Sequence, residues 1–495
     1  MIKMIRFLKK EWYIILILLV SVFPVFLYLG NLPFSSWDES LFAMRAYHIL
    51  ERGELLFNFL EFDSYKDHSN RKPFLTSLIQ VGFWKLFGIS ELNLRIPVSL
   101  AFLTLLCIPV FLRERLRLDR IHVWCFALLL LTSGSMIRNH VVRTGDQDVF
   151  VCLYMFLAAL FFYLYLNQPS ADKKKYLNLV VLFTFCTLYT KTIFAFMFFP
   201  GFILYAIYIK RLKDLLSDRR VYLLGGILLF SFICYNLYMN SRNPFFIEGF
   251  LNHALGRYGT VVDGQEYKGF SYYWLGIYNK SFSDFIYFLV LSPVLLITKK
   301  GYKYRDLQIF AWIISLSFIF IISLSKTKTF WYVIPALPFV ALVLALNIEY
   351  FFRHLFRVLS LQWKGFVYGI VISGLFISPY MDVMAKVVEH KYMPYYDFEM
   401  EGAMIKRLEG SLPEVKDYTI LIKRENPQTS LYTSWFNEQK KYKLKIDIFP
   451  IENYKEGQCV LSCNYNLSET IRKKYNYKAL SDWKSCHLMQ LESIR

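Results

Sequence analysis

Long apolar segments alternate with short polar ones along most of the chain. Eleven segments are apolar, nearly free of charge and long enough to predict membrane-spanning helices, namely 12–30, 96–112, 121–137, 149–166, 176–190, 192–209, 221–240, 283–298, 306–324, 330–352 and 365–381. One further apolar run, Phe74–Gly88, is interrupted by Lys85 and is shorter than the ~20 residues that a spanning helix needs. We interpret it as an interfacial or re-entrant helix. The pattern therefore predicts a polytopic all-α membrane domain over residues 1–381.

The pattern changes after Met381, where charged residues become more frequent. Strand-like runs are found at Tyr418–Ile422, Leu444–Phe449 and Gln458–Leu461. Helix-like runs are found at Glu399–Leu408, Ser430–Lys441 and Leu467–Tyr475. This alternation predicts a small soluble α/β domain over residues 382–495.

The composition agrees with a membrane protein and limits its partners. The chain of 495 residues is 56% hydrophobic and only 19% charged, which is more apolar than a soluble domain of this size. Its formal net charge of +19 does not indicate a nucleic-acid partner, because Lys and Arg occur in short clusters between the apolar runs. Such clusters are typical of cytoplasmic loops and of contacts with anionic membrane lipids.

The basic clusters also predict the orientation. The N-terminal cluster and those near 113–120, 173–175, 210–220, 299–305 and 353–364 fall on one side if the eleven spans alternate. We therefore expect a cytoplasmic N-terminus and an extracytoplasmic C-terminal domain. The loops near 31–95, 138–148, 241–282 and 325–329 are expected outside, as is a tight turn at Lys191. The short loops and compact outer domain favour the inner (plasma) membrane of a bacterium.

Three cysteines of the C-terminal domain, Cys459, Cys463 and Cys486, would then lie in an oxidising compartment. Because three is an odd number, at most one internal disulfide can form and one thiol is left over. No histidine has zinc-ligand spacing to them, so we expect no metal at these cysteines.

The outward loops contain four carboxylates suited to chemistry on a hydroxyl group. Asp38 and Glu39 open the first loop, and Asp146 and Asp148 end the second. A carboxylate at a membrane interface is costly to desolvate and can act as a general base. Structural alternatives are a solvated loop start or an N-cap of the helix over 39–51 for Asp38 and Glu39, and a cap of the helix that begins near Asp148 for one of Asp146 and Asp148.

Cations in the same loops could clamp a phosphate. The main candidates are Lys72, Arg257 and Lys328, and the possible supporting residues are Arg71, His253, Lys191 and Lys326. Structural alternatives are a Lys72 that reaches toward lipid headgroups, a Lys191 that binds helix-end carbonyls, and a His253 that forms loop hydrogen bonds. A metal site of His253, Asp38 and Asp148 ranks below these. No cofactor is expected to be required, although the pattern leaves a divalent ion open.

A series of short motifs resembles a known superfamily in collinear order. They are Trp37-Asp38-Glu39, Arg71-Lys72-Pro73-Phe74-Leu75, Phe87-Gly88-Ile89-Ser90-Glu91, Arg95-Ile96-Pro97-Val98-Ser99, Arg143 to Asp148, Thr190-Lys191-Thr192, His253 to Tyr258 and Ser325 to Pro335. Over residues 1 to about 350 the series resembles the protein O-mannosyltransferases and the bacterial aminoarabinose (lipid A) transferases, which are C-type glycosyltransferases (GT-C fold). The chain departs from the superfamily pattern at Thr192, where Gly is usual, at Phe74, where a second Pro is usual, and at Phe330-Trp331 before Tyr332.

The resemblance implies an inverting hexosyl- or pentosyltransferase. Its donor would be a sugar on a polyprenyl phosphate, and its acceptor a hydroxyl of lipid A, another glycolipid or glycan, or a protein. The implied roles are Asp38 as base, Glu39 orienting the acceptor or supporting the first helix, Asp148 or Asp146 near the sugar, and a donor-phosphate site of Lys72, Arg257, Lys328 and Tyr332.

Two rival functions remain open at this point. A flippase or transporter usually places ionisable groups in the middle of the membrane, whereas the predicted spans carry almost none. A lipid-linked oligosaccharide ligase or polymerase would also be an interfacial enzyme, but it would transfer a long glycan from a diphosphate carrier.

Overall fold

The structure, a computed structural model, describes residues 10–36, 38–53, 72–137, 141–168, 170–242, 244, 246–261, 267–298, 302–356, 364–389, 391, 400–423, 426–449 and 454–495. The first half of the helical part contains α2 (Tyr13–Phe26), α3 (Asp38–Arg52), α4 (Leu75–Phe87), α5 (Glu91–Leu112), α6 (Arg120–Leu131), α7 (Gly134–Ile137), α8 (Asp148–Asn167), α9 (Ser170–Lys191), η2 (Thr192–Phe196), α10 (Phe199–Tyr208) and α11 (Leu212–Ser217). The second half contains α12 (Arg219–Arg242), α13 (Phe246–Gly259), α14 (Tyr272–Gly276), η3 (Ile277–Ser281), η4 (Ser283–Phe285), α15 (Tyr287–Thr298), α16 (Arg305–Ser323), η5 (Phe330–Ala336), α17 (Leu337–Leu355), α18 (Lys364–Gly374) and α19 (Ile377–Glu389).

The described helices include six that are long and apolar enough to cross a membrane, and a seventh span if the bent pair α18 and α19 is counted as one. Four shorter apolar helices, Tyr13–Phe26, Arg120–Leu131, Phe199–Tyr208 and Tyr287–Ile297, coincide with the remaining predicted spans. A helix of 12 residues is only about 18 Å long, against the ~30 Å of a bilayer core. An integral membrane protein is therefore confirmed, whereas the number of eleven crossings stays a prediction.

Much of the apolar core of this bundle is formed by buried residues of α5, α6, α8, α16 and α17. A polar cluster ties three helices together within it: Gln308 of α16 donates to Ser292 of α15 at 2.7 Å and to Asn347 of α17 at 2.8 Å. All three side chains are buried. Because a polar group in an apolar interior needs a hydrogen-bonding partner, this cluster fixes how the three helices pack.

The C-terminal domain has a five-stranded sheet with the order β2-β1-β3-β5-β4, formed by β1 (Asp417–Ile422), β2 (Lys443–Ile448), β3 (Cys459–Ser462), β4 (Tyr475–Trp483) and β5 (Cys486–Ile494). The strand β1 is parallel to both β2 and β3, while β5 is antiparallel to both β3 and β4. Its helices are α20 (Met400–Ser411), α21 (Pro427–Lys440) and α22 (Tyr465–Lys474). The small α/β domain is confirmed, and the predicted boundary at residue 381 falls within α19.

Side chains alternate between two apolar layers of this sheet. Tyr418, Ile420 and Ile422 of β1 pack in one cluster with α20 and α21, whereas Leu421 packs in another cluster with α22. Cys463 and Cys486 form a disulfide and Cys459 is a free thiol. The prediction of at most one disulfide and one remaining thiol is therefore confirmed.

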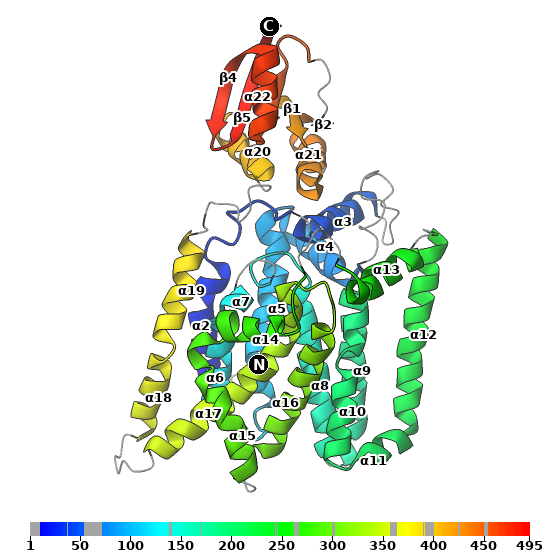
Figure 1. Cartoon of the computed structure of the whole chain (residues 1–495), viewed down its shortest axis with the longest axis vertical. Helices are drawn as coiled ribbons and strands as arrows, with labels where there is room; N and C mark the ends of the chain where they lie inside the picture. Colours follow the sequence, from blue (N-terminus) through cyan, green and yellow to red (C-terminus); the bar gives the residue numbers. More distant parts are fainter. Residues whose placement is uncertain are drawn as a thin grey trace.

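Figure 1 shows the C-terminal domain at one end of the bundle, with α3 and α4 between the two parts. The helices α20 and α21 are the elements of the domain nearest the bundle. One apolar cluster continues from the domain into α3 and α4 and includes Phe34, Tyr47, Trp84, Tyr432 and Trp435. The domain is therefore packed directly on α3 and α4, two helices of the predicted loop over residues 31–95.

We expect the stability of the C-terminal domain to depend on pH through Glu401 of α20. One of its carboxyl oxygens is buried and has no hydrogen-bond partner among the residues described. Burial raises the pKa of Glu401 from 4.5 to about 7. The folded domain therefore holds this proton more tightly than the unfolded chain. The stability that protonated Glu401 contributes to the folded domain is present in full below the pKa of the unfolded chain, and it is lost as the pH rises through about 7.

The difference between the two pKa values corresponds to on the order of 3 kcal/mol, so thermal unfolding of the domain should occur at a lower temperature at pH 8 than at pH 4. Glu401→Gln should remove this part of the pH dependence. Unfolding of the purified full-length protein, followed across this pH range for both forms, measures it. Equal pH dependence in the two proteins would contradict the assignment.

Candidate active site

The first charged pair of the site lies at the start of α3. Asp38 is the first residue of this helix, and its Oδ1 accepts a hydrogen bond from Lys72 Nζ. The Asp38 side chain is 35% exposed and the Lys72 side chain 21%, so both can be reached from outside the bundle. A carboxylate paired with an ammonium group at a partly exposed surface can exchange its partner for a substrate group.

A second contact from the same helix fixes the position of Lys72. Arg45 lies two turns after Asp38 and is buried. Its guanidinium donates to the carbonyl of Lys72 at 2.5 Å and to that of Pro73 at 3.0 Å. The helix α3 therefore holds this segment both through the side chain of Lys72 and through its backbone.

Glu39, the neighbour of Asp38, is fully buried. Arg95 of α5 binds it through two hydrogen bonds, from Nε to Oε1 at 2.7 Å and from Nη2 to Oε2 at 2.9 Å. The backbone N–H groups of Gly145 (2.6 Å) and Ser35 (2.5 Å) donate to the same two oxygens. We infer that Glu39 has the supporting role among the two expected for it, because both oxygens are engaged and shielded from an acceptor.

Arg95 extends this support to the segment that precedes α3. Its remaining N–H groups donate to three backbone carbonyls at 2.6–3.0 Å, those of Leu29, Leu32 and Pro33. Bidentate pairing of Arg with a carboxylate fixes orientation as well as distance. The Glu39–Arg95 pair thus joins the first loop, the second loop and α5 at one buried point.

The second charged pair joins α8 and α9. Asp148 is the first residue of α8, and its Oδ1 accepts a hydrogen bond from Lys191 Nζ at 2.5 Å. Lys191 is the last residue of α9, and its ammonium lies 4.8 Å from the centre of the Tyr332 ring. Lys191 therefore contributes to the site through Asp148, beyond the turn-capping role considered for it.

Tyr332 connects this pair to α13. The Tyr332 hydroxyl accepts a hydrogen bond from Arg257 Nη1. The backbone carbonyl of Arg257 in turn accepts hydrogen bonds from the N–H groups of Lys326 and Thr327, each at 3.0 Å, and from the Ser325 hydroxyl at 2.8 Å. The loop over residues 325–329 and the end of α13 therefore form one unit, which presents the Arg257 guanidinium beside Tyr332.

Lys328 lies on this loop but is directed differently. Its side chain is buried, and its Nζ donates to the carbonyl of Ser325 in the same loop. Burial lowers the pKa of Lys328, because the ammonium form loses its hydration. A phosphate group brought next to Lys328 would compensate this loss.

The two charged pairs face a common region. Asp38 lies close enough to Asp148 and Lys191 to interact electrostatically with both. The helix ends that carry these residues belong to the end of the bundle that faces the C-terminal domain (Figure 1). The structure therefore brings together Asp38, Lys72, Asp148, Lys191, Tyr332 and Arg257.

The other predicted residues are placed as follows. Asp146 is buried and accepts a hydrogen bond from the Thr144 hydroxyl at 2.7 Å. Lys326 lies within the loop over residues 325–329 and is exposed. Arg71 lies outside the described residues, as does the side chain of His253.

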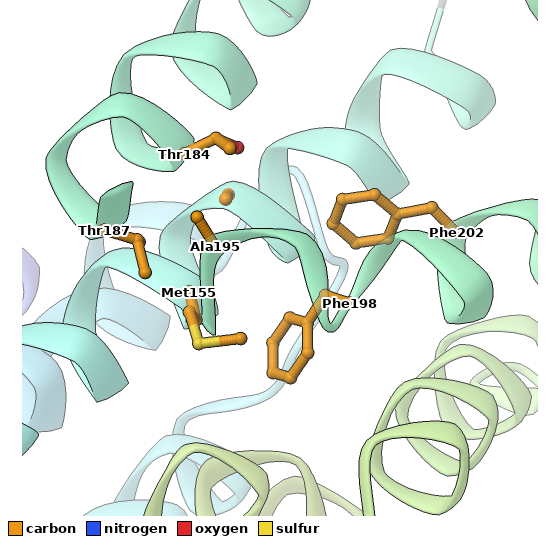
Figure 2. A pocket seen from close by; sticks show the side chains of 7 residues that line it. Met155, Thr184, Thr187, Ala195, Phe198 and Phe202 are labelled. Carbon is orange, nitrogen blue, oxygen red and sulfur yellow. The ribbon is translucent and has the colours of Figure 1, made fainter. Parts of the chain in front are cut away.

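A small cavity lies between the helices that carry the Asp148–Lys191 pair. Figure 2 shows it between α8, α9, η2 and α10, lined by Met155, Thr184, Thr187, Ala195, Phe198 and Phe202. The hydroxyls of Thr184 and Thr187 donate to carbonyls of their own helix at 2.8 and 2.9 Å. The lining is therefore apolar and does not suit a sugar or a phosphate.

Among the described residues, one group has ligand atoms close enough together to hold a metal ion: Asp119, His122 and Glu349. His122 Nδ1 accepts a hydrogen bond from the Asp119 backbone N–H at 3.0 Å, so its Nε2 carries the proton that faces Glu349 at 3.3 Å. Arg353 also pairs with both carboxylates. A metal on Nε2 would force the proton onto Nδ1, against the Asp119 N–H, so this group is better explained as an ion-pair network.

Two buried cations of the candidate site were given no role in the sequence analysis. Arg95 was quoted only in the Arg95 to Ser99 motif, beside the predicted span 96–112, and Arg45 lies in the predicted helix over 39–51; the structure places Arg95 at the start of α5 and Arg45 within α3. A lone Arg in such a segment is a signal for a buried partner, because a buried guanidinium needs acceptors. Neither the Glu39 partner nor the backbone carbonyls could be identified from spacing.

Comparisons with known proteins show what this chain resembles. Residues 71–238 match the family described as dolichyl-phosphate-mannose-protein mannosyltransferase, a stretch that contains Lys72, Asp148 and Lys191. No curated protein sequence matches the chain. The matched stretch ends before Arg257 and begins after Asp38.

Solved structures resemble almost the whole chain. ArnT from Cupriavidus metallidurans bound to undecaprenyl phosphate has a TM-score of 0.71 at 13% identity, covering 96% of this chain and 97% of that chain. Its apo state has a TM-score of 0.69 at 12% identity, covering 97% and 98%. The Archaeoglobus fulgidus oligosaccharyltransferase tethered with an acceptor peptide has a TM-score of 0.51 at 12% identity, covering 89% of this chain and 64% of that chain.

The fold is the GT-C fold of membrane glycosyltransferases. With the family match, it identifies this chain as a glycosyltransferase of the GT-C superfamily. The superfamily predicted from the ordered motifs is thereby confirmed.

Proposed function

We propose that this glycosyltransferase moves one sugar from a polyprenyl phosphate to a hydroxyl group at the outer face of the membrane, with inversion at the anomeric carbon. The donor class is supported by the ArnT structure that contains undecaprenyl phosphate and by the dolichyl-phosphate-mannose donor in the description of the matched family. The acceptor class, a lipid, a glycan or a protein, is suggested by the same family description and by the oligosaccharyltransferase bound to an acceptor peptide.

The observation that carries the proposal is that two charged pairs lie at one end of the bundle. Asp38 with Lys72 faces Asp148 with Lys191, Tyr332 and Arg257. A reaction at an anomeric carbon needs a base for the acceptor proton and fixed cations for the departing phosphate. Both are present in this region, on six different segments of the chain.

In the proposed reaction, Asp38 is the base, three cations bind the phosphate, and Asp148 supports one of them. Asp38 takes the proton of the acceptor hydroxyl while the oxygen of that hydroxyl forms a bond to the anomeric carbon of the donor sugar. The bond between that carbon and the phosphate oxygen breaks, and the electron pair leaves with the polyprenyl phosphate. Arg257 and Lys191 bind the phosphate, and Lys72 moves from Asp38 to the phosphate when the donor binds. Asp148 keeps Lys191 charged and oriented.

The same proposal places the C-terminal domain outside a bacterial plasma membrane and the N-terminus in the cytoplasm. The Cys463–Cys486 disulfide supports this orientation, because disulfides persist in oxidising compartments. The charged pairs then lie on the outer side with the domain, where a hydroxyl acceptor is available.

Arg257→Ala tests the donor site. Loss of a charge-assisted hydrogen bond to phosphate costs on the order of 1.5–3 kcal/mol, so the Kd for undecaprenyl phosphate should rise about 10- to 150-fold. A matched control is Arg242→Ala at the end of α12. The Arg242 guanidinium also lies over a tyrosine ring, 5.5 Å from the centre of Tyr238, against 5.7 Å from Arg257 to Tyr332.

Binding is measured with the purified protein in nanodiscs and radiolabelled undecaprenyl phosphate. Transfer is followed as release of undecaprenyl phosphate from synthetic hexose and pentose donors, with extracted native membranes as the acceptor source. Arg242→Ala should bind as the wild type does. If Arg257→Ala also binds the lipid with unchanged Kd, Arg257 is not part of the donor site.

A further inference from the structure

The C-terminal domain holds the backbone of the segment that leads into α3. Gln428 of α21 donates from Nε2 to the carbonyl of Phe34, and the Phe34 N–H donates to the Tyr432 hydroxyl at 3.1 Å. Gln428 also accepts a hydrogen bond from the Gly402 N–H at 3.2 Å. Both backbone groups of Phe34 are therefore bound by side chains from a domain almost 400 residues further along the chain.

The Phe34 side chain fills the junction between the two parts of the molecule. It is fully buried, and its ring lies 6.2 Å from Trp84 of α4, 5.5 Å from Tyr432 and 6.2 Å from Trp435 of α21. Aromatic rings at such distances contribute beyond the area they bury. Phe34 is therefore fixed by its ring as well as by its backbone.

Charged contacts strengthen the same junction. The Tyr432 hydroxyl donates to Glu91 Oε1 at 2.6 Å, and Lys406 Nζ lies 3.1 Å from that oxygen. Lys406 also donates to the carbonyl of Gly30 at 2.8 Å. Because Glu91 is the first residue of α5, the domain is fastened to the helix that carries Arg95.

The segment is tied at its other end to the first turn of α3. Ser35 N–H donates to Glu39 Oε2 at 2.5 Å. Ser35 C=O accepts hydrogen bonds from the Ser40 backbone at 3.1 Å and from the Ser40 hydroxyl at 2.6 Å. Asp38 is in this turn, so its position depends on where Ser35, and hence Phe34, is held.

We propose that Tyr432 and Gln428 of the C-terminal domain are positioning residues for Asp38. They fix Phe34, Phe34 fixes Ser35, and Ser35 fixes the first turn of α3. The inference rests on the proposed role of Asp38 as the base. A displacement of a reacting group by about 1 Å can cost 10²-fold in rate, so a hydroxyl remote from the reacting atoms can control kcat. The C-terminal domain is then a part of the active site rather than an appended module.

Tyr432→Phe tests the proposal, with Tyr475→Phe as the matched control. Tyr475 is also a buried tyrosine of this domain whose hydroxyl accepts a hydrogen bond from a backbone N–H, that of Tyr454 at 3.0 Å. Tyr432→Phe should lower kcat about tenfold or more with the synthetic undecaprenyl phosphate sugars, with an unchanged Kd for undecaprenyl phosphate. Tyr475→Phe should leave kcat unchanged at a similar loss of thermal stability.

Two readouts separate positioning from a general loss of structure. Hydrogen exchange of the Phe34 and Ser35 amides should accelerate in Tyr432→Phe and not in Tyr475→Phe. In an Asp38→Asn background, Tyr432→Phe should lower the residual rate no further, because both changes act through the same carboxylate. An additive loss in that background, or equal kcat in Tyr432→Phe and the wild type, would overturn the proposal.

A second variant addresses the same junction without removing a hydroxyl. A Cβ on Gly402 would lie 2.6 Å from the Gln428 amide carbon, so Gly402→Ala must displace this side chain from Phe34. It should reproduce the loss of kcat and the faster exchange at Phe34.

If the wild-type protein binds no undecaprenyl phosphate, the proposed function itself fails. If binding holds and both variants keep full kcat, only the positioning role fails.

Discussion

Asp38→Asn should give a folded protein that binds undecaprenyl phosphate and transfers sugar about 10²–10⁴-fold more slowly than the wild type. The substitution keeps the shape of the side chain and an oxygen that can accept from Lys72, but the amide cannot take a proton. Loss of a general base has an effect of this size. Transfer from the synthetic donors and lipid binding, both with protein in nanodiscs, measure the two properties separately.

The alternative role of Asp38, at the start of α3, predicts the opposite result. Loss of a residue that only caps a helix costs about 1 kcal/mol of stability and leaves the rate intact. Asp148→Asn is the informative companion, since Asp148 is the other carboxylate in this region and is paired with Lys191. Near wild-type transfer by Asp38→Asn together with an inactive Asp148→Asn would mean that the base is in the second loop.

Much of the fold could be predicted from the sequence because its signals are local. Each predicted span coincides with an apolar helix, and the three strands β1, β2 and β3 were expected within a residue or two. The strands β4 and β5 were missed. Only Tyr475 of β4 is fully buried, and the alternation of apolar and polar residues that begins at Tyr475 breaks after Ala479, where the pairing with β5 shifts register. The formation of β4 depends on pairing with β5, which sequence spacing does not reveal.

The site was predictable in part for the same reason. Asp38, Lys72, Asp148 and Arg257, which the structure brings together in the candidate site, were proposed because charged residues next to apolar runs stand out and occur in ordered motifs. Their partners depend on tertiary contacts. The hydrogen bonds of Phe34 with Gln428 and Tyr432, for example, join residues separated by 394 and 398 positions. Lys191 was expected only as a supporting residue, because its contact with Asp148 depends on how α8 and α9 pack.

The Glu39–Arg95 pair explains why two adjacent carboxylates can have different roles. Asp38 faces the accessible region, and Glu39 one position later turns into the protein, since neighbouring helical residues point about 100° apart. Its charge is compensated by Arg95 and by two backbone N–H groups. A charge that is buried without compensation would instead be strongly destabilising. The pair is therefore a rigid support from which Asp38 is presented.

Arg95→Met should accordingly destabilise the protein by about 3–5 kcal/mol, because Glu39 would remain buried without its counter-ion. Thermal unfolding of the purified protein should occur at a clearly lower temperature. The double variant Glu39→Met with Arg95→Met should recover part of the loss, since it removes both charges. Glu469→Gln, which breaks the partly exposed pair with Arg472 at 3.0 Å, is the control and should change stability by no more than about 0.5 kcal/mol.

A loss of stability in Arg95→Met no larger than in this control would mean that the Glu39–Arg95 pair does not support the site. A double variant less stable than Arg95→Met alone would show that Glu39 is held by its backbone donors, and that Arg95 acts mainly through the carbonyls of the preceding segment.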